Sequence, residues 1–145
     1  MLSDLVAVQL DGDRLDRDEL VATVQLVLVA GQETTADLVA NGILALLTHP
    51  EQWQLLKDDP SLAGAAVEEI ARFDGPVELA PPRYAFRVFP LGGGIHFCLG
   101  APLARLQGRI VFEKIAEQLP ELRLLADPRS LRGVSQRLAC LPLAA

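Results

Sequence analysis

The sequence is poor in cysteine, histidine, methionine and aromatic residues. Its 145 residues include two Cys, two His, one Met, one Trp and one Tyr. Two cysteines cannot build the disulfide framework of a small secreted domain, and no signal-peptide pattern opens the chain, so we expect a cytoplasmic protein. The few Cys and His residues also lie at spacings that match no zinc-binding pattern, so a structural zinc site is not expected.

Basic charge is also scarce. The chain has 13 Lys and Arg residues against 19 Asp and Glu residues, a net charge of −6, which disfavours a nucleic-acid partner. The basic residues are concentrated in the last 66 positions, which carry 9 basic and 4 acidic side chains. This basic C-terminal segment could face an anionic ligand or an acidic partner protein, or it could form an ordinary solvated surface.

Long uninterrupted apolar runs are missing as well. The nearest candidate, Leu20 to Leu47, contains Glu33 and Asp37, and one acid at the centre of a bilayer costs about 2.5–3.5 kcal/mol. We therefore expect a long buried helix and no membrane span. Hydrophobic residues nevertheless make up 50% of the chain. Because a domain of this size buries only roughly 70% of the surface that its unfolded chain exposes, a partner, a ligand or a missing part of the protein should cover the remainder.

Capping residues and prolines predict the helices. Asp16 followed by Glu19 has the form of a helix N-cap, and the helix that it begins should run for about 32 residues, to His49 and Pro50. The chain should be mainly α and form one domain. The other expected elements are helices over 51–57, from Ser61 to Arg72 and from Pro102 to Leu119, and short strands over 83–88, 121–125 and 137–141, the last two as a C-terminal hairpin.

The helix that begins at Pro102 carries two apolar stripes. Two stripes predict a helix that is covered on more than one side, not one that lies on the surface. At about 100° per residue, the stripes are Leu103, Leu106 and Ile110, and Ala104, Val111, Ile115 and Leu119.

Cys98 is the residue that points most directly to chemistry. It precedes the helix expected at Pro102, where unpaired backbone N–H groups favour a thiolate, and the glycines around it let backbone amides approach the sulfur. A thiolate serves as a nucleophile or a metal ligand, but His96, two positions away in an irregular loop, is badly placed to act as its base. The open alternative is a buried cysteine with a structural role.

The polar centre of the long helix is a second unusual feature. Residues 30–35, Ala-Gly-Gln-Glu-Thr-Thr, place an acid, two hydroxyls and a glycine between apolar flanks, which costs stability. A functional site is one reason for a helix to bear that cost. Glu69 and Arg72 stand three residues apart on a later helix, and by themselves they indicate only a surface ion pair.

Three segments together resemble one family, the cytochromes P450. Residues 91–100, Leu-Gly-Gly-Gly-Ile-His-Phe-Cys-Leu-Gly, resemble the haem-thiolate loop with its pattern Phe-Gly-x-Gly-x-His/Arg-x-Cys-x-Gly. Residues 30–35 resemble the oxygen-activating motif of the family's central helix. Residues 69–72, Glu-Ile-Ala-Arg, resemble its Glu-x-x-Arg motif and are followed by Pro81-Pro82-Arg83. The runs 20–83 and 88–119 are similar to soluble bacterial members throughout.

The resemblance implies a haem site around Cys98. Cys98 would be the axial ligand of the iron of haem b, and a thiolate in that position pushes electron density onto the iron and favours O–O cleavage. Gly92, Gly94 and Gly100 would shape the loop around the sulfur, and His96 and Arg83 match positions that bind the haem propionates.

The resemblance also assigns roles on the two preceding helices. Gly31 would let haem and dioxygen come close to the central helix, and Glu33 with Thr34 would pass protons to the bound oxygen. Glu69 and Arg72 would form a buried structural pair.

The chain departs from the family pattern in three ways. Leu91 replaces the phenylalanine at the head of the cysteine loop. Only 26 positions separate Arg72 from Cys98, where the family has several strands and a meander, so an internal block is expected to be missing near Phe86 and Arg87. The family's N-terminal part is also expected to be absent. We therefore expect residues 1–145 to form a single partial domain: the long central helix, the Glu-x-x-Arg helix, the cysteine loop with its following helix, and a small C-terminal β hairpin.

Two hypotheses of function follow. In the first, the chain is a haem-thiolate monooxygenase that inserts one oxygen atom from O2 into a small organic substrate, and Arg105 and Arg109 lie on a basic face where a ferredoxin-type electron donor docks. In the second, the chain is a non-catalytic truncated remnant that binds haem weakly or not at all, because a cysteine ligand without a distal wall cannot exclude water or position a substrate. A third arrangement, with a separately encoded N-terminal piece that completes the protein, also stays open.

Overall fold

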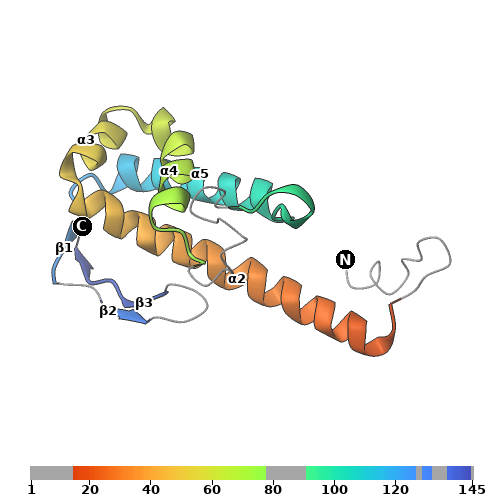
Figure 1. The fold of residues 1–145 in the computed structure, drawn as a ribbon. Coiled ribbons are helices and arrows are strands. Elements are labelled where there is room, and N and C mark those ends of the chain that lie inside the picture. The colour runs from red at the N-terminus through yellow and green to blue at the C-terminus, as the bar shows by residue number, and fades with distance from the viewer. Residues whose placement is uncertain (1–14, 78–90, 127–128, 132–136, 145) are drawn as a thin grey trace. The chain divides into compact units, whose positions relative to one another are not determined.

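The computed structural model describes residues 15–77, 91–126, 129–131 and 137–144 (Figure 1). The strand expected over 83–88, the junction expected at Phe86 and Arg87, and Arg83 lie outside the described residues. The prediction of a mainly α chain with a small amount of β structure is confirmed. The described helices are α2 (Arg17–Thr48), α3 (Pro50–Asp58), η1 (Pro60–Leu62), α4 (Ala63–Phe73), η2 (Gly94–His96) and α5 (Ala101–Gln118), and the strands are β1 (Arg123–Leu124), β2 (Arg129–Leu131), β3 (Arg137–Cys140) and β4 (Leu143–Ala144).

Both ends of α2 form where the capping residues predict them. The backbone N–H of Asp16 donates to Glu19 Oε2 at 2.9 Å, and the backbone N–H of Glu19 donates to Asp16 Oδ1 at 2.8 Å. This reciprocal pair is a capping box. At the other end Pro50 begins α3 in the first helical turn, where its missing N–H is harmless. The helix has 32 residues, so its predicted length is confirmed.

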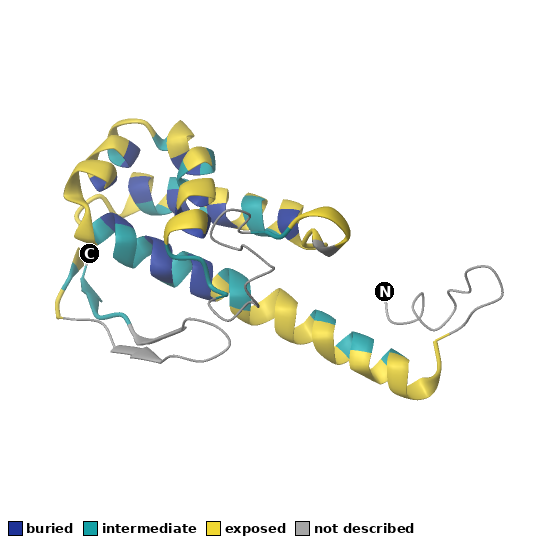
Figure 2. Cartoon of the chain, in the orientation of Figure 1, coloured by how far each residue is buried: buried dark blue, intermediate teal, exposed yellow. Residues whose placement is uncertain are grey.

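Burial along α2 differs from the prediction. The chain divides into two units within this helix, the first ending at Glu33 and the second beginning at Thr34. Within the first unit Leu26, Leu28 and Val29 are 69%, 62% and 60% exposed (Figure 2), so the expectation of a long buried helix is wrong for this half. The described part of the first unit is a single helical segment, so no other described element of that unit packs against it. No helix in the described residues is long and apolar enough to cross a bilayer.

The core of the second unit lies between the second half of α2 and helices α3, α4 and α5. Phe112 is fully buried there, and Gly42 leaves room for its ring, because a Cβ at Gly42 would overlap Phe112 Cζ. Gly108 allows α5 a similar approach to α4, since a Cβ there would lie 2.9 Å from Val67 Cγ2. The buried hydrophobic cluster consists of Leu38, Leu46, Trp53, Leu56, Ala63, Val67, Ile70, Ala71, Phe112, Ala116 and Leu122.

Helix α5 buries one face only. Its buried residues are Ala101, Gly108, Phe112 and Ala116, which include the contacts with α2 and α4. The stripe of Leu103, Leu106 and Ile110 is 58%, 48% and 46% exposed, and the second stripe is half-buried at Ala104, Val111 and Ile115 and exposed at Leu119. The prediction of a helix covered on more than one side is therefore wrong for this chain. The wheel pattern shows which residues are apolar but cannot show whether a second element reaches them.

The C-terminal strands pair differently from the prediction. Strand β1 pairs antiparallel with β4, with Leu124 opposite Leu143, and β2 pairs antiparallel with β3, with Leu131 opposite Arg137. Strands β1 and β3 occupy the two segments in which strands were expected, so those elements are confirmed. The expected small C-terminal β hairpin is confirmed, but β2 and β3 form it, and β1, which was expected in it, pairs with β4 instead. The sequences of β2 and β4 are too short to give a periodic signal.

Candidate functional site

The cysteine loop is shaped by two glycines with left-handed backbone angles. Gly92 has a φ of 75° and Gly94 a φ of 60°, a region that side chains with a Cβ rarely adopt. Gly94 begins the single turn of η2, and the N–H of Phe97 donates to its carbonyl at 3.2 Å. The glycine-rich sequence is therefore required by the course of the backbone on the approach to Cys98.

Cys98 stands where this loop closes and α5 begins. Its backbone N–H donates to the carbonyl of Leu91 at 2.8 Å, which joins the two ends of the loop. Its own carbonyl accepts from the N–H of Ala101 at 3.1 Å, in the first turn of α5. The thiol is free and exposed. Within the described residues the thiol is therefore not buried, unlike the cysteine of the structural alternative.

The surface around the thiol is apolar. Ile95 and Leu99, on either side of Cys98 in sequence, are 96% and 93% exposed, and Phe97 is 51% exposed. Along α5 the exposed stripe of Leu103, Leu106 and Ile110 follows at helical spacing. Exposed apolar side chains on this scale indicate a surface that something else covers.

These residues fit one face of a haem. The group needs a soft axial ligand for its iron and an apolar wall for its flat ring, and an accessible thiol among exposed leucines and a phenylalanine provides both. Arg83 and His96 are expected to bind the haem propionates, but Arg83 and the side chain of His96 lie outside the described part of the chain.

The polar centre of the long helix forms regular helix in α2. Gly31 and Glu33 are exposed, and Thr34 is half-buried. A Cβ at Gly31 would meet nothing within 4 Å, so no packing within the described chain requires a glycine at this position. The predicted reason for glycine at this position remains the close approach of haem and dioxygen to the helix.

Glu69 and Arg72 form the expected pair on α4, but the pair is not buried. Arg72 Nε donates to Glu69 Oε2 at 2.8 Å, and Arg72 Nη2 also donates to Glu69 Oε1. The side chains are 61% exposed for Glu69 and 55% for Arg72, which corrects the expectation of a buried pair. The hydrogen bond from Arg72 holds the pKa of Glu69 below its ordinary value, and the same contact raises the pKa of Arg72. The residues that α4 does bury are on another face of the helix, at Ala63, Val67, Ile70 and Ala71.

Arg105 connects the two helices that flank the cysteine loop in the sequence. Its Nη2 donates to Glu68 Oε2 on α4 at 3.2 Å, and its Nε donates to the other carboxylate oxygen of Glu68. This hydrogen bond raises the pKa of Arg105, and the nearby Cys98 makes a smaller contribution in the same direction. The predicted donor-docking residue is thus already paired across α4 and α5, whereas Arg109 is exposed.

Asn41 is a supporting residue that the sequence analysis did not single out. It is 1% exposed, and its Nδ2 donates to the carbonyl of Asp74 at 3.2 Å, which ties α2 to the residue that follows α4. An isolated amide among apolar residues is the sequence signal for such a contact, because a buried amide must find hydrogen-bond partners.

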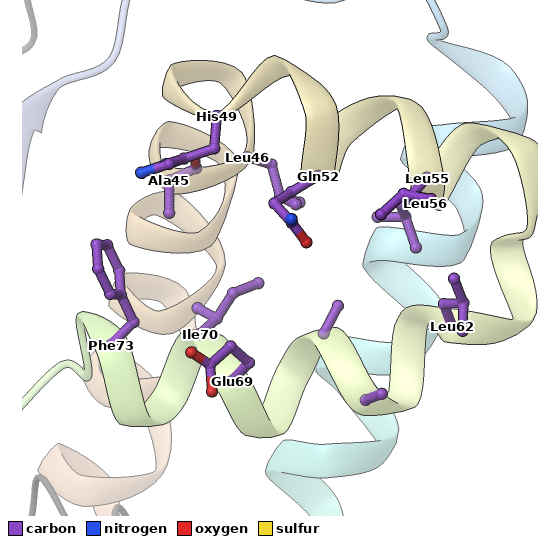
Figure 3. Close-up of a pocket in the computed structure, with 12 residues that line it drawn as sticks. Ala45, Leu46, His49, Gln52, Leu55, Leu56, Leu62, Glu69, Ile70 and Phe73 are labelled. Carbon is purple, nitrogen blue, oxygen red and sulfur yellow. The ribbon is translucent and has the colours of Figure 1, made fainter.

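A separate hollow of about 460 Å³ lies away from the cysteine loop, among the end of α2, α3, η1 and α4 (Figure 3). Its walls are mostly apolar, and Glu69 is the charged residue among them. The lining residues are Ala45, Leu46, His49, Gln52, Leu55, Leu56, Leu62, Ala65, Ala66, Glu69, Ile70 and Phe73.

The fold of this chain is similar to that of solved bacterial cytochromes P450. Among solved structures, the chain is similar to a myxobacterial cytochrome P450, CYP267B1 in complex with myristic acid, with a TM-score of 0.85 and 31% identity over 98% of this chain and 47% of that one. No protein-family model matches the chain.

Curated relatives agree with the structural comparison. The chain is 42% identical to a vitamin D(3) 25-hydroxylase of Pseudonocardia autotrophica over 86% of this chain and 42% of the relative. It is 36% identical to the cytochrome P450 monooxygenase PikC of Streptomyces venezuelae over 83% of this chain and 39% of the relative. The predicted resemblance is confirmed: the chain is a homologue of the bacterial cytochromes P450, and it spans less than half the length of these curated relatives.

Proposed function

We propose that this chain is the C-terminal portion of a haem-thiolate monooxygenase that inserts one oxygen atom from O2 into a small organic substrate. The observation that carries the proposal is the free, exposed thiol of Cys98 at the end of a glycine-closed loop, surrounded by exposed apolar side chains. The relatives named as a hydroxylase and a monooxygenase support the same reaction class.

The residues of the loop would hold the haem through its iron. Cys98 would ligate the iron of haem b, while Phe97, Leu99 and Leu103 would cover the porphyrin and exclude water from the sulfur. Bound haem supplies the activation of dioxygen, and the thiolate tunes it by donating electron density. His96 and Arg83 are proposed as hydrogen-bonding partners of the propionates, and Gly92, Gly94 and Gly100 as the backbone positions that support the sulfur.

The polar centre of α2 would provide the proton path. Glu33 and Thr34 are adjacent in the helix, one with a carboxylate and the other with a hydroxyl, which are groups that accept and donate protons. We assign them to proton delivery, and we assign Gly31 to close approach of the bound group. The electron donor is proposed to be a ferredoxin-type protein, and Arg109 is an exposed cation of α5 that could contact it.

A second candidate function is a non-catalytic remnant. The exposed apolar residues Leu26 and Leu28, and the exposed Glu69–Arg72 pair, favour it, because they leave groups uncovered that lie away from the cysteine loop. The alignment with the hydroxylase also extends over 169 residues, which is longer than this whole chain, although it includes only 86% of it. That excess supports the proposed internal gap near Phe86 and Arg87. A separately encoded piece would restore the missing cover.

Haem binding by the full chain decides between the two candidates. We expect the purified chain to take up haem and, when reduced and treated with CO, to show the red-shifted Soret band of thiolate-bound iron. Cys98→Ala should abolish the band, because no other soft ligand replaces the sulfur at that position. Cys140→Ala is the matched control and should retain it. A wild-type chain without haem uptake would contradict the proposal that this chain holds haem by itself.

A further inference from the structure

The hollow among α2, α3, η1 and α4 has the size and composition of a small-molecule site. Its volume of about 460 Å³ lies within the range of about 300–1,000 Å³ in which proteins hold ligands of moderate size. Leu55, Leu62 and Phe73 line it and are 53%, 41% and 57% exposed, so an apolar ligand would remove three large side chains from water.

Polar groups are few in the hollow, and they lie at particular places. Figure 3 shows the amide end of Gln52 on α3 and the carboxylate of Glu69 on α4 on facing sides of it. His49 is engaged at the rim: its Nδ1 lies 2.8 Å from the carbonyl of Ala45, and its ring meets Phe73 edge to face with centroids 5.6 Å apart. Gln52 and Glu69 are therefore the polar residues that can orient a ligand.

The lining of the hollow contains one carboxylate and no Lys or Arg side chain, and Arg72 pairs with that carboxylate from outside the lining. Glu69 is the charged lining residue, and the hydrogen bond from Arg72 lowers the pKa of its carboxyl group and keeps it ionised. A carboxylate has about four lone-pair sites, so the two hydrogen bonds from Arg72 leave it able to accept another donor.

The surrounding segment is acidic as well. Residues 50–74 contain six Asp and Glu residues against Lys57 and Arg72. Lys57 does not line the hollow, and its Nζ lies 5.9 Å from the centroid of the Trp53 ring. Arg105 of α5 pairs with one of these acids, Glu68, and the formal excess of acid that is left favours the approach of a cation over that of an anion.

We propose that this hollow binds a cationic amphiphile, a molecule with an apolar body and one protonated amine, whose body lies against Leu55, Leu62 and Phe73 and whose amine donates to Glu69. This inference is independent of the haem proposal, because it uses no residue of the cysteine loop. A protein that bound no haem could still bind the amine, and the reverse also holds.

Two probes of equal length separate charge from apolarity. Titration calorimetry of the full chain with n-octylamine and with n-octanol should show the amine binding about five- to tenfold more tightly, since both bury the same tail and only the amine pairs with Glu69. The ratio should fall toward one as NaCl is raised, because salt screens a partly exposed ion pair. Equal affinity for the two probes at low salt, or no binding of the amine, would overturn the proposal.

Matched variants locate the site. Glu69→Gln should remove the preference for the amine, whereas Glu68→Gln, a neighbouring acid that does not line the hollow, should keep it. Ala65→Trp should fill the hollow and weaken both probes at least tenfold, and Ala36→Trp, at an exposed position outside it, should leave them unchanged. Circular dichroism checks that each variant keeps its helices. If Ala65→Trp folds and still binds the amine with full affinity, the hollow is not the site. Should Glu69→Gln unfold the chain, the salt series and Ala65→Trp still decide the question.

Discussion

Glycine is required for different physical reasons at different positions of this chain. Gly92 and Gly94 have positive φ angles, so the loop before Cys98 needs glycine for its backbone. Gly42 and Gly108 have ordinary helical angles and instead leave space for Phe112 and Val67. Gly31 has neither reason within the described chain. The reason for a glycine at position 31 is therefore expected to lie in contact with another molecule.

Alanine substitution distinguishes these glycines. We expect Gly94→Ala to lower the free energy of unfolding by about 1–2 kcal/mol, because a Cβ is disfavoured at a left-handed φ. Gly31→Ala should do the opposite and stabilise α2 by about 0.5–1 kcal/mol, since alanine is the better helix former and nothing obstructs its Cβ. Urea unfolding followed by helical circular dichroism measures both. Stabilisation by Gly94→Ala would contradict the conformation described for the loop.

At the scale of elements, α4 and α5 are joined by packing and by charge. Val67 meets Gly108 within the buried contact, and Glu68 bonds Arg105 at its edge. The ion pair is 48% exposed at Glu68 and 42% at Arg105, so its contribution to stability is small compared with the packing. The ion pair links the N-terminal part of α5, the helix that follows Cys98, to α4.

A double-mutant cycle measures this tie. Glu68→Gln and Arg105→Gln, alone and together, should give a coupling energy of about 0.2–1 kcal/mol in the free energy of unfolding at low salt. The coupling should shrink in 1 M NaCl because exposed charges are screened. Lys114 and Glu117, a pair within α5, serve as the reference and should couple by about 0.2–0.5 kcal/mol. A coupling of zero at low salt would show that the pair does not hold the two helices together in solution.

At the scale of the whole molecule, the apolar content of the chain exceeds what its described parts bury. The sequence predicted a surplus from composition, and the structure locates it on the first half of α2 and around the cysteine loop. Relatives that are more than twice as long as the matched region have further chain with which to cover such surfaces. The surplus is found in a chain that spans less than half the length of these relatives.

Dye binding tests the exposure directly. We expect the chain to bind an apolar fluorescent dye strongly and the double variant Leu28→Gln with Val29→Gln to bind clearly less of it, with helix content unchanged, because both residues are exposed. Leu38→Gln, at a position only 4% exposed, is the contrast and should lower the helix content instead. Fluorescence titration and circular dichroism report the two effects. Unchanged dye binding in the double variant would show that this half of α2 is covered in solution.

Much of the fold followed from local signals. The Asp16 capping box, Pro50 and Pro102 predicted the ends of three helices to within a residue or two, because caps and prolines act on neighbouring backbone groups alone. The glycines of the cysteine loop were expected to shape it from the family resemblance, and the structure adds that Gly92 and Gly94 have left-handed φ angles. The family itself was identified from motifs that lie within single segments.

Burial and pairing were decided by the tertiary structure. The apolar faces of α2 and α5 were readable as apolar, yet Leu28 and Leu103 are exposed and the Glu69–Arg72 pair stays on the surface. The strands expected to pair with each other, β1 and β3, took β4 and β2 as partners. A sequence pattern records what a residue prefers, whereas exposure and pairing depend on which other segments are present to meet it. This chain spans less than half the length of its relatives. Its sequence therefore determines the local motifs, whereas the exposure of its apolar surfaces depends on which other segments are there to cover them.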